Sequence, residues 1–328
     1  IDGYESAIET FDSIRGWKDA DEQVEICKQK IEEIKEEVKR KAEAERIAMK
    51  KSAERSKKAL AVITIAVCVC VAMAILWTNV LQPMVKYNSA VSLMDNGKYK
   101  EAIEAFEAMG DYKDSEEKCK EAFQKYYTYA EIGDVITLGS YEQDTDIYNG
   151  KEAIEWIVLD KNSSSLLLIS KYALDCQRYN STWKDVSWES SSLREWLNNS
   201  FINSAFNAEE QNLIETASFT LKEDSASAVN TNSTIEDKIF LLNTNEAEKY
   251  FSSDFARQCK PTTYAIVRGV STDSSNGNCR WWLLSLAPTR YSAATVQVDG
   301  SINFNGYFVG NNDYAVRPAM WIDLSNLD

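Results

Sequence analysis

A stretch of twenty residues without a charge, ALAVITIAVCVCVAMAILWT, runs from Ala59 to Thr78 and constrains the chain more than any other feature. As an α-helix it would be about 30 Å long, which matches the hydrocarbon core of a bilayer. A buried core helix is less favoured, because such helices interrupt their apolar surface with polar positions. A cleaved signal peptide is disfavoured because the stretch is long and lies about sixty residues into the chain. The sequence therefore predicts one transmembrane helix over residues 59–80.

The charges on either side of this stretch predict its orientation. Lys86 is the nearest basic residue after it, whereas five lie just before it: Lys50, Lys51, Arg55, Lys57 and Lys58. Since flanking basic residues favour the cytoplasmic side, we expect residues 1–58 in the cytoplasm and the C-terminal part outside the cell. Residues 1–58 hold 14 basic and 15 acidic side chains, so nearly all of the net charge of −15 is extracellular. The chain is thus predicted to be a single-pass protein of the cell membrane.

The composition disfavours several classes of function. The chain has no histidine, which excludes Ser-His-Asp and Cys-His catalysis and histidine-ligated zinc. Its excess of acidic over basic residues disfavours nucleic acid, because phosphate contacts require clustered cations. These features disfavour His-dependent enzymes and a nucleic-acid partner; whether the chain is an enzyme stays open, with a non-enzyme favoured.

The cysteines divide between the two sides of the predicted membrane. Four lie in the part predicted to be extracellular, where disulfides are permitted: Cys119, Cys176, Cys259 and Cys279. Four cysteines allow three pairings and require none of them. The sequence leaves the pairing open, with a bridge between Cys259 and Cys279 as the first choice. A zinc site is disfavoured because the chain has no CxxC spacing.

An internal repeat with an offset of 95 residues relates YESAIETFDSIRGWKDADE, from Tyr4, to YKEAIEAFEAMGDYKDSEE, from Tyr99. Both copies have apolar residues at helical spacing, followed by an aromatic-Lys-Asp turn and a second helical pattern. They resemble tetratricopeptide-type helical hairpins, a cytoplasmic one over residues 1–34 and an extracellular one over residues 81–128. One hairpin cannot bury its apolar face alone, so the second copy is expected to lean on a helix over about residues 85–96, and the first on units upstream. A spacer is favoured over a groove for a protein partner.

Residues 35–58 are expected to form a charged helical stalk between the first hairpin and the membrane. They are rich in strong helix formers. Apolar residues at coiled-coil-like spacing lead into this segment, but the pattern is short and fades into alanines. Dimerisation through it stays open, and a solvated stalk is favoured over a binding site.

The pattern changes after Tyr127, where short β-branched and aromatic runs alternate with Gly, Asn, Ser and Asp. Residues 129–328 are therefore predicted to form an α+β domain with a mainly antiparallel sheet, preceded by the all-α stalk. The segment SSLREWLNNSFINSAF is amphipathic and predicted to be helical, and Ala208–Thr216 a second short helix. The predicted strands are VITLGSY, IEWIVLD, SLLLISKYAL, TYAIVRGV, RWWLLSL, AATVQVD and RPAMWIDL.

The domain resembles a known bacterial family through motifs that occur in order. They are LGSYEQ, IEWIVLD, LLLISKYALDCQRYN, W-x-x-SSLREWLNNSFINSAFNAEEQNLI, DKIFLLNTNEAEKYF, CKPTTYA, RWWLLS and VRPAMWIDL. Over residues 131–324 this series is similar to domain-of-unknown-function family 6273. The resemblance implies a C-type-lectin-like or formylglycine-generating-enzyme-like fold, but no reaction. Where the family has WWLRSPG this chain has WWLLSLAP, so Leu284 replaces its arginine, and any role of that arginine would pass to Arg280 or Arg290.

The segment DGSINFNGYFVGNNDYAV, residues 299–316, is the predicted ligand-binding surface. Amide and tyrosine side chains are typical of adaptable recognition surfaces. In lectin-like relatives this terminal region contacts the ligand, although Asn, Gly and Asp are equally typical of a pair of turns. The candidate ligand residues are Asn303, Asn305, Tyr307, Asn311, Asn312, Asp313 and Tyr314.

Five further residues are predicted to be structural. Four are tryptophans, which as large aromatics are best interpreted as packing. The fifth is an arginine expected in a buried salt bridge with Asp299 or Glu195. The structural set is Trp196, Trp281, Trp282, Trp321 and Arg317.

Together these features predict a membrane-anchored bacterial surface protein displaying a lectin-like domain that binds a peptide, glycan or cell-wall ligand. One alternative is a formylglycine-generating-type enzyme that oxidises cysteine, which would require a reactive, accessible thiol. Another is a transmembrane sensor or scaffold. No cofactor is expected; calcium has weak support, since Asp144 and Asp146 are only a fragment of a calcium loop.

Overall fold

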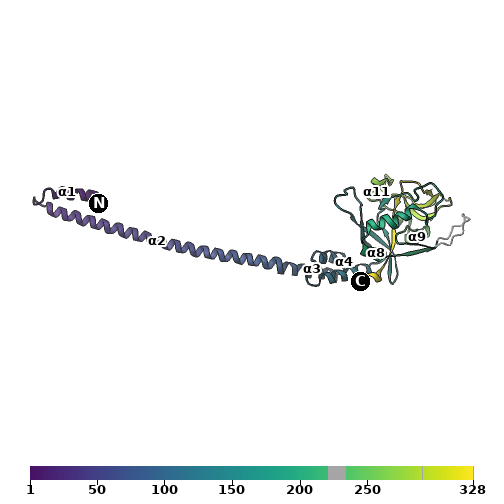
Figure 1. Ribbon diagram of the computed structural model, residues 1–328, viewed down its shortest axis with the longest axis horizontal. Helices are drawn as coiled ribbons and strands as arrows, with labels where there is room; N and C mark the ends of the chain where they lie inside the picture. The colour runs from purple at the N-terminus through teal and green to yellow at the C-terminus, as the bar shows by residue number, and fades with distance from the viewer. Residues whose placement is uncertain (221–233, 290, 328) are drawn as a thin grey trace. The chain divides into compact units, whose positions relative to one another are not determined.

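A computed structural model describes residues 1–220, 234–289 and 291–327 of the chain. These residues form two compact units, Ile1–Val85 and Lys86–Asp328. The first unit is helical (Figure 1), whereas the second combines a small helical bundle with sheets.

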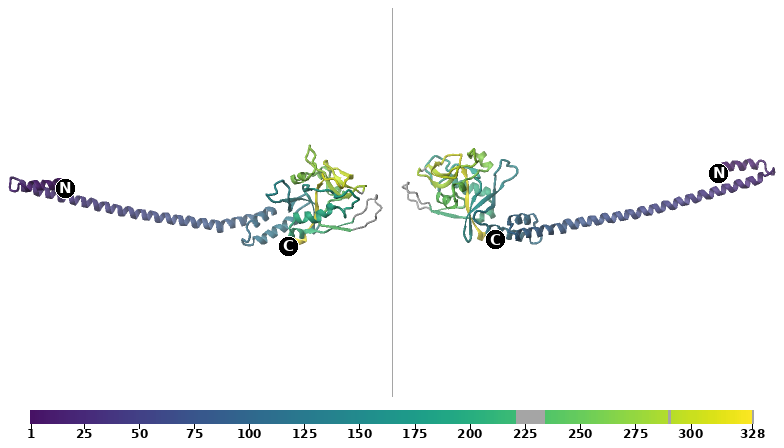
Figure 2. Two further views of the ribbon diagram at one scale, coloured as in Figure 1. Left: turned by 45° about the horizontal axis from the view of Figure 1, so that its top comes forward. Right: turned by 180° about the vertical axis from the view of Figure 1, so that it is seen from behind.

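The N-terminal unit is a short helix packed against a long one. Helix α1 (Asp2–Asp12) folds back along the first turns of α2 (Ala20–Leu76), as both views of Figure 2 show. On α2, apolar side chains at helical spacing are buried beneath α1: Ala20, Val24, Cys27 and Ile31. After Ile31 no residue of α2 is buried, and the helix continues through a π-helical turn, η1 (Trp77–Leu81). The long helix therefore owes its packing to its first three turns.

The predicted transmembrane segment lies in the second half of α2. Its most apolar 18-residue window has a mean hydropathy of 3.0, and none of that window is buried by the described residues. A helix that is apolar on every face and lacks a protein partner is not a core helix of this fold, and it is compatible with a membrane anchor. This helix is the candidate membrane span.

A three-helix bundle begins the second unit. It consists of α3 (Gln82–Asp95), α4 (Tyr99–Glu107) and α5 (Ser115–Thr128). One apolar cluster joins the three helices and contains Ala90, Met94, Ala102, Phe106 and Ala122. The second repeat copy thus leans on the helix that precedes it, as predicted.

The two repeat copies share an unusual turn. Lys18 and Lys113, which are 95 residues apart, are the two described non-glycine residues with positive φ, at 52° and 55°. Each ammonium lies over the aromatic ring of the preceding residue, 4.4 and 5.5 Å from the centroid. Asp19 and Asp114 then occupy the N-cap positions of the following helices. The repeat therefore encodes one turn conformation, and the tetratricopeptide-like assignment stays a prediction.

Two five-stranded sheets form the C-terminal domain. The first has the order β1 (Val135–Tyr141), β2 (Glu152–Lys161), β3 (Ser165–Ser170), β12 (Ala319–Asp323) and β5 (Ile214–Glu215). The second has the order β10 (Ile302–Phe308), β9 (Ser292–Val296), β8 (Trp281–Leu286), β11 (Ala315–Val316) and β4 (Asp175–Cys176). A separate pair joins β6 (Ala217–Thr220) to β7 (Thr234–Asp237). Apart from the parallel pairing of β11 with β8, the paired strands of the described residues are antiparallel, which confirms the predicted α+β class.

Short helices connect these strands. The predicted helix within SSLREWLNNSFINSAF is confirmed as α6 (Ser192–Trp196), η2 (Leu197–Phe201) and α7 (Ile202–Ala205). The second predicted helix ends earlier than expected, because its last residues form β5. This helix is α8 (Ala208–Leu213). The remaining helices are α9 (Thr244–Tyr250), α10 (Asp254–Arg257), α11 (Thr263–Arg268) and the 3₁₀ turn η3 (Leu324–Asn326).

The strand predicted for TYAIVRGV is wrong, because this segment forms α11. The side chain of Thr262 accepts a hydrogen bond from the backbone N–H of Ala265 and caps the first turn. Gly269, at φ 125°, ends the helix in a conformation that other residues rarely adopt. A short β-branched run does not distinguish strand from helix, and here the cap and the glycine decide.

The two adjacent tryptophans of β8 are both completely buried, on opposite faces of the strand. The indole N–H of Trp281 donates to the carbonyl of Arg257 at 3.2 Å, and that of Trp282 donates to the carbonyl of Gln177 at 3.0 Å. Both indoles therefore pack inside the protein. The sheet around β8 is therefore covered on both sides.

The salt bridge predicted for Arg317 is wrong. Arg317 is buried, and among the described residues no carboxylate, including those of Asp299 and Glu195, lies within 4.0 Å of its guanidinium. Its Nε donates to the carbonyl of Ser170 at 3.0 Å, and its guanidinium lies 5.1 Å from the ring centroid of Trp281. Backbone carbonyls and an aromatic face thus hold the cation in place of an acid.

The repeat provides a matched pair of substitutions. Phe106→Ala should destabilise the α3–α5 bundle by about 3–5 kcal/mol, because Phe106 is buried and its removal leaves a cavity. Phe11→Ala, at the equivalent position of the first copy, should cost clearly less, because Phe11 is only half-buried. Amide hydrogen exchange of the full chain in detergent micelles measures both losses. Equal losses at the two positions would contradict the packing described here.

Candidate functional site

Part of the predicted ligand segment is a strand in place of the expected recognition loops. Residues 302–308 form β10, an edge strand of the second sheet that pairs with β9. The register shifts at Gly306, where a Cβ atom would lie 2.3 Å from the carbonyl oxygen of Ala293. The side chain of Asn303 donates to the carbonyl of Gly306 and accepts from the N–H of Asn305. Asn303 therefore stabilises the bulge, and its amide is already engaged.

On one face of β10, Tyr307 begins an aromatic cluster that continues into the core. Its ring centroid is 5.2 Å from that of Tyr314, which in turn stacks on Trp282 at 4.5 Å. Tyr314 is completely buried, and its hydroxyl has no hydrogen-bond partner among the described residues. The guanidinium of Arg280 lies 5.8 Å from the Tyr307 ring centroid and 3.9 Å from the carboxylate of Asp313. The structure thus places Tyr314 beneath this surface and not on it.

On the other face, Phe308 belongs to a row of exposed rings. Tyr291, Phe308 and Trp183 are 46%, 48% and 65% exposed. The Phe308 ring centroid lies 5.9 Å from that of Tyr291 and 5.7 Å from that of Trp183. Gly310 makes room for this row, because a Cβ there would lie 2.6 Å from the Trp183 ring. We call these three residues the aromatic ladder.

Sequence reasoning missed the aromatic ladder. Its members come from three separate segments, and a tryptophan or phenylalanine in a sequence is more often core than surface. The one sequence feature that relates to the ladder is Gly310, because a side chain at this position would collide with the Trp183 ring. That signal becomes readable only once the two segments are known to meet.

A cleft of about 440 Å³ adjoins the ladder. We call it the arginine cleft, because two guanidinium groups line it and none of its described lining residues is acidic. Asn312 is the predicted ligand residue that reaches it, while the backbone N–H of Asn311 is held by the Phe308 carbonyl. The lining residues are Cys176, Gln177, Arg178, Ser181, Ser192, Trp196, Arg268 and Asn312.

The two arginines of the cleft differ in their surroundings. Arg268 lies 3.6 Å from a carboxylate oxygen of Asp175, a buried residue that also accepts a hydrogen bond from Tyr141 at 2.5 Å. Burial raises the pKa of Asp175, against the Tyr141 hydrogen bond and the Arg268 charge, which lower it. Arg178 is exposed and has no hydrogen bond or ion pair to any described residue. The cleft therefore carries positive charge that is at most partly compensated.

Two hydrogen-bonded segments join the cleft to the ladder. The backbone N–H of Asn180 donates to the carbonyl of Val309 at 2.9 Å. In the segment that contains Asn180, Ser181 lines the cleft and Trp183 belongs to the ladder. In the segment that contains Val309, Asn312 lines the cleft and Phe308 belongs to the ladder. The ladder and the cleft are therefore adjoining parts of one surface.

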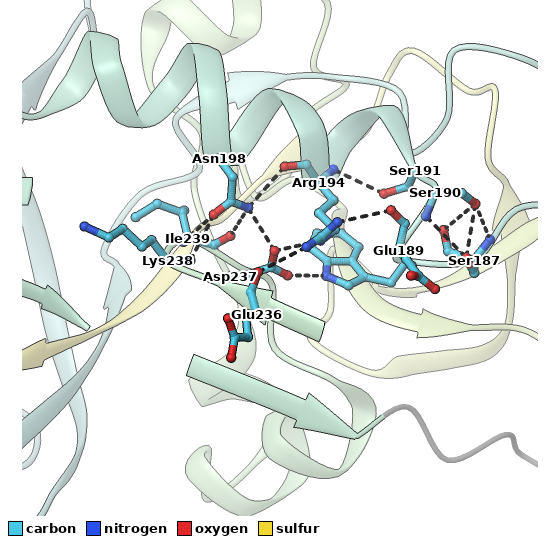
Figure 3. A network of polar contacts seen from close by, with 11 residues as sticks. Ser187, Glu189, Ser190, Ser191, Arg194, Asn198, Glu236, Asp237, Lys238 and Ile239 are labelled. Atoms are coloured by element: carbon cyan, nitrogen blue, oxygen red, sulfur yellow. Dashed lines mark hydrogen bonds and ion pairs between the residues drawn. The ribbon is translucent and has the colours of Figure 1, made fainter. Parts of the chain in front are cut away.

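The segment around Trp188 forms a polar network with a structural role (Figure 3). Asp237, on β7, accepts from the Trp188 indole at 2.8 Å and from Arg194 Nε at 2.6 Å. Asn198 bridges to the backbone N–H groups of Lys238 and Ile239. A hollow of about 390 Å³ lies beside this network, but the network's donors are engaged within the protein. The network ties the α6–α7 segment to β7.

Three carboxylates gather next to β1. Oxygen atoms of Glu142, Asp144 and Glu152 lie within 4.8 Å of one another. Burial and the neighbouring acids raise the pKa of Glu142. Asp146 is not part of this group, and its carboxylate instead accepts from the N–H of Tyr148. Asp144 and Asp146 each accept a backbone N–H of the same turn, and of the two only Asp144 belongs to the carboxylate group.

The thiols of the C-terminal domain that were considered for catalysis are buried. Cys176, Cys259 and Cys279 are 7%, 3% and 0% exposed, so they lack the accessibility that the enzyme alternative requires. Cys259 and Cys279 lie side by side, since the N–H of Cys279 donates to the Cys259 carbonyl at 2.9 Å and the Cys279 thiol donates to the same carbonyl at 3.5 Å. Burial raises the pKa of Cys259, but the Cys279 hydrogen bond and the Arg317 charge together lower it below its ordinary value.

Residues 163–324 match the model of a protein family described as Domain of unknown function (DUF6273). This match supports the family resemblance for the part of the domain from β3 to β12. The match begins at residue 163 and not at the expected residue 131. Strands β1 and β2 therefore lie outside the match, although they belong to the same sheet as β3 and β12. No curated protein and no solved structure matches the chain.

Removal of Arg194 should destabilise the domain. Arg194→Met should cost about 3 kcal/mol of folding free energy, because it leaves the buried Asp237 carboxylate without its cation. Burial already holds the pKa of Asp237 above its ordinary value, so stability from this group falls as pH rises through the folded pKa. The variant raises that pKa further, and its loss should be larger at about pH 7 than at about pH 4. Chemical denaturation at the two pH values measures this, with the exposed pair partner Lys249→Met as a control expected to change little. A pH-independent loss would contradict a charged Asp237.

Cys259 and Cys279 should form a disulfide when the chain is folded with oxidised glutathione. The Cys259 thiolate attacks the glutathione disulfide and releases one thiol; Cys279 then attacks the mixed disulfide and releases the second. Peptide mapping after alkylation of the unfolded chain should show these two cysteines linked and Cys176 alkylated. Alkylation of both Cys259 and Cys279 would contradict the pairing.

Proposed function

We propose that this chain is a membrane-anchored surface protein whose C-terminal domain binds a glycan on the aromatic ladder. The N-terminal 58 residues would lie in the cytoplasm, and a lectin-like domain would be displayed outside the cell. The domain's two mainly antiparallel sheets and the family match support the lectin-like assignment.

The candidate span supports the anchor. None of the described residues covers this apolar helix, and burial in a bilayer would remove its apolar surface from water. The five basic residues before it support an N-in orientation.

The aromatic ladder is the observation that carries the proposed binding function. The three adjoining rings of the ladder are each about half exposed or more, so they present apolar surface to water. Exposed apolar surface of this kind often marks a ligand- or protein-binding site. Flat rings with free faces suit the C–H faces of sugar rings, and the row continues over neighbouring centroids 5.7 and 5.9 Å apart. Tyr291 also presents a phenolic hydroxyl for a sugar hydroxyl. An extended saccharide fits this row better than a compact ligand.

A peptide ligand would use different features of the same region. A peptide strand would add to the free edge of β10 through backbone hydrogen bonds, and it would not require exposed stacked rings. The ladder side chains therefore distinguish the two ligand classes, because their truncation should abolish glycan binding and spare strand addition.

Glycan and peptide arrays with the full chain in detergent micelles test this function. We expect glycan binding that falls at least tenfold in Trp183→Ala and in Phe308→Ala, because each variant removes a stacking ring. Phe255→Ala is the matched control, since Phe255 is an exposed ring on α10 without a ladder contact in the described structure. Glycan binding that survives both ladder variants, or binding confined to peptides, would contradict the proposal.

A further inference from the structure

The arginine cleft gives the surface next to the ladder a charge opposite to that of the chain as a whole. Arg178 and Arg268 line it, whereas the full sequence carries a net charge of −15. Surface arginines in an acidic protein are usually paired with nearby carboxylates. Arg178 has no such partner among the described residues, and the partner of Arg268 is the single buried carboxylate of Asp175.

Uncharged donors lie beside the two cations. The side chain of Asn312 and the hydroxyl of Ser181 make no hydrogen bond to other described residues. The hydroxyl of Ser192 accepts from the N–H of Ser181, which leaves its own proton free to donate. Trp196, half-buried, forms an apolar wall of the cleft. The cleft thus offers guanidinium, amide and hydroxyl donors next to an aromatic surface.

The path from ladder to cleft is continuous. Asn180 and Val309 are joined by a backbone hydrogen bond, and the cleft carbonyl of Asn312 accepts from the Cys176 thiol at 3.0 Å. Gly269 permits the close approach of this carbonyl, because a Cβ at that position would lie 3.2 Å from its oxygen. An oligosaccharide bound on the ladder would therefore extend into the arginine cleft at one end.

We infer that the glycan is acidic: a sugar of the bound chain places its anionic group in the cleft between Arg178 and Arg268, while neighbouring sugars stack on the ladder. This inference rests on the proposed glycan-binding function. Guanidinium groups bind carboxylates and phosphates through paired N–H donors, and the neutral donors fit the hydroxyls of the same sugar. A neutral glycan would leave Arg178 without a counter-charge.

The two arginines have different tasks in this arrangement. Arg178 is free for the ligand, and its replacement removes no described contact within the protein. Arg268 is shared with Asp175 and stacks at 6.0 Å on the ring of Tyr264, so its position is set before any ligand arrives. Because both arginines are exposed to solvent, binding of the anionic group should weaken with salt.

Matched glycans that differ only in charge test the inference. The probes are uronic-acid oligosaccharides and the same oligosaccharides after reduction of their carboxyl groups to neutral alcohols, with phosphorylated oligosaccharides as a second anionic arm. The full chain in micelles should bind an anionic member about tenfold more tightly than its neutral partner, and this preference should shrink with salt. Arg178→Gln should remove most of the preference while leaving the thermal unfolding midpoint unchanged. Arg178→Lys, which keeps the charge but loses the paired donors, should retain part of it.

The outcomes separate this inference from the proposed function. Trp183→Ala should weaken binding of anionic and neutral members alike, whereas Arg178→Gln should weaken the anionic member only. Equal binding of the two members, or a preference that persists in Arg178→Gln, would overturn the acidic ligand and leave glycan binding standing. Absence of binding to every glycan would overturn both.

Discussion

The C-terminal domain depends on the burial of both faces of β8. Trp281 and Trp282 point to opposite sides of this strand, and both are completely enclosed. Trp281 supports the ring and guanidinium contacts around Arg317, while Trp282 stacks on Tyr314, the residue beneath Tyr307. Because these indoles also donate to the carbonyls of Arg257 and Gln177, they fix the last residue of α10 and the residue that follows β4. The surface carrying the ladder and the cleft is held in place from below by this arrangement.

The polar groups at the Asp237 hollow have a structural role, whereas those at the arginine cleft are available to a ligand. Around Asp237, the Trp188, Arg194 and Asn198 donors are satisfied within the protein, so that hollow has little left to offer a ligand. In the arginine cleft, Arg178 and the Asn312 amide have no described partners. The sequence motifs point to the Asp237 network more clearly than to the arginine cleft, but the cleft has more polar groups free to bind a ligand.

Local patterns predicted those parts of the fold whose period was unambiguous. VITLGSY is β1 without a shift, RWWLLSL contains β8, and the long amphipathic run contains α6 to α7. The strand predicted for TYAIVRGV failed because a threonine cap and a terminal glycine outweigh β-branched residues in so short a run. β10 was missed because its Asn and Gly content resembles a turn, although the glycine serves a bulge.

The candidate site was less predictable than the fold, since it is assembled from distant segments. Asn312 was predicted and lines the cleft, but Arg178, Arg268 and Trp183 come from segments that had no ligand signal. Tyr314 was predicted as a contact and is buried, because a tyrosine pattern does not reveal which ring the core takes. Only the packing of residues 180–183 against 308–312 brings these groups together.

Fluorine NMR of the chain labelled with 5-fluorotryptophan tests the central claim most directly, that a glycan lies on the ladder and reaches the cleft. The sequence has nine tryptophans, and Trp183→Phe and Trp196→Phe assign the two resonances that matter. Titration with an acidic oligosaccharide should shift the resonances of Trp183 and Trp196 and leave those of the buried Trp281 and Trp282 unchanged. An unchanged Trp183 resonance at a saturating concentration of a bound glycan would contradict the account.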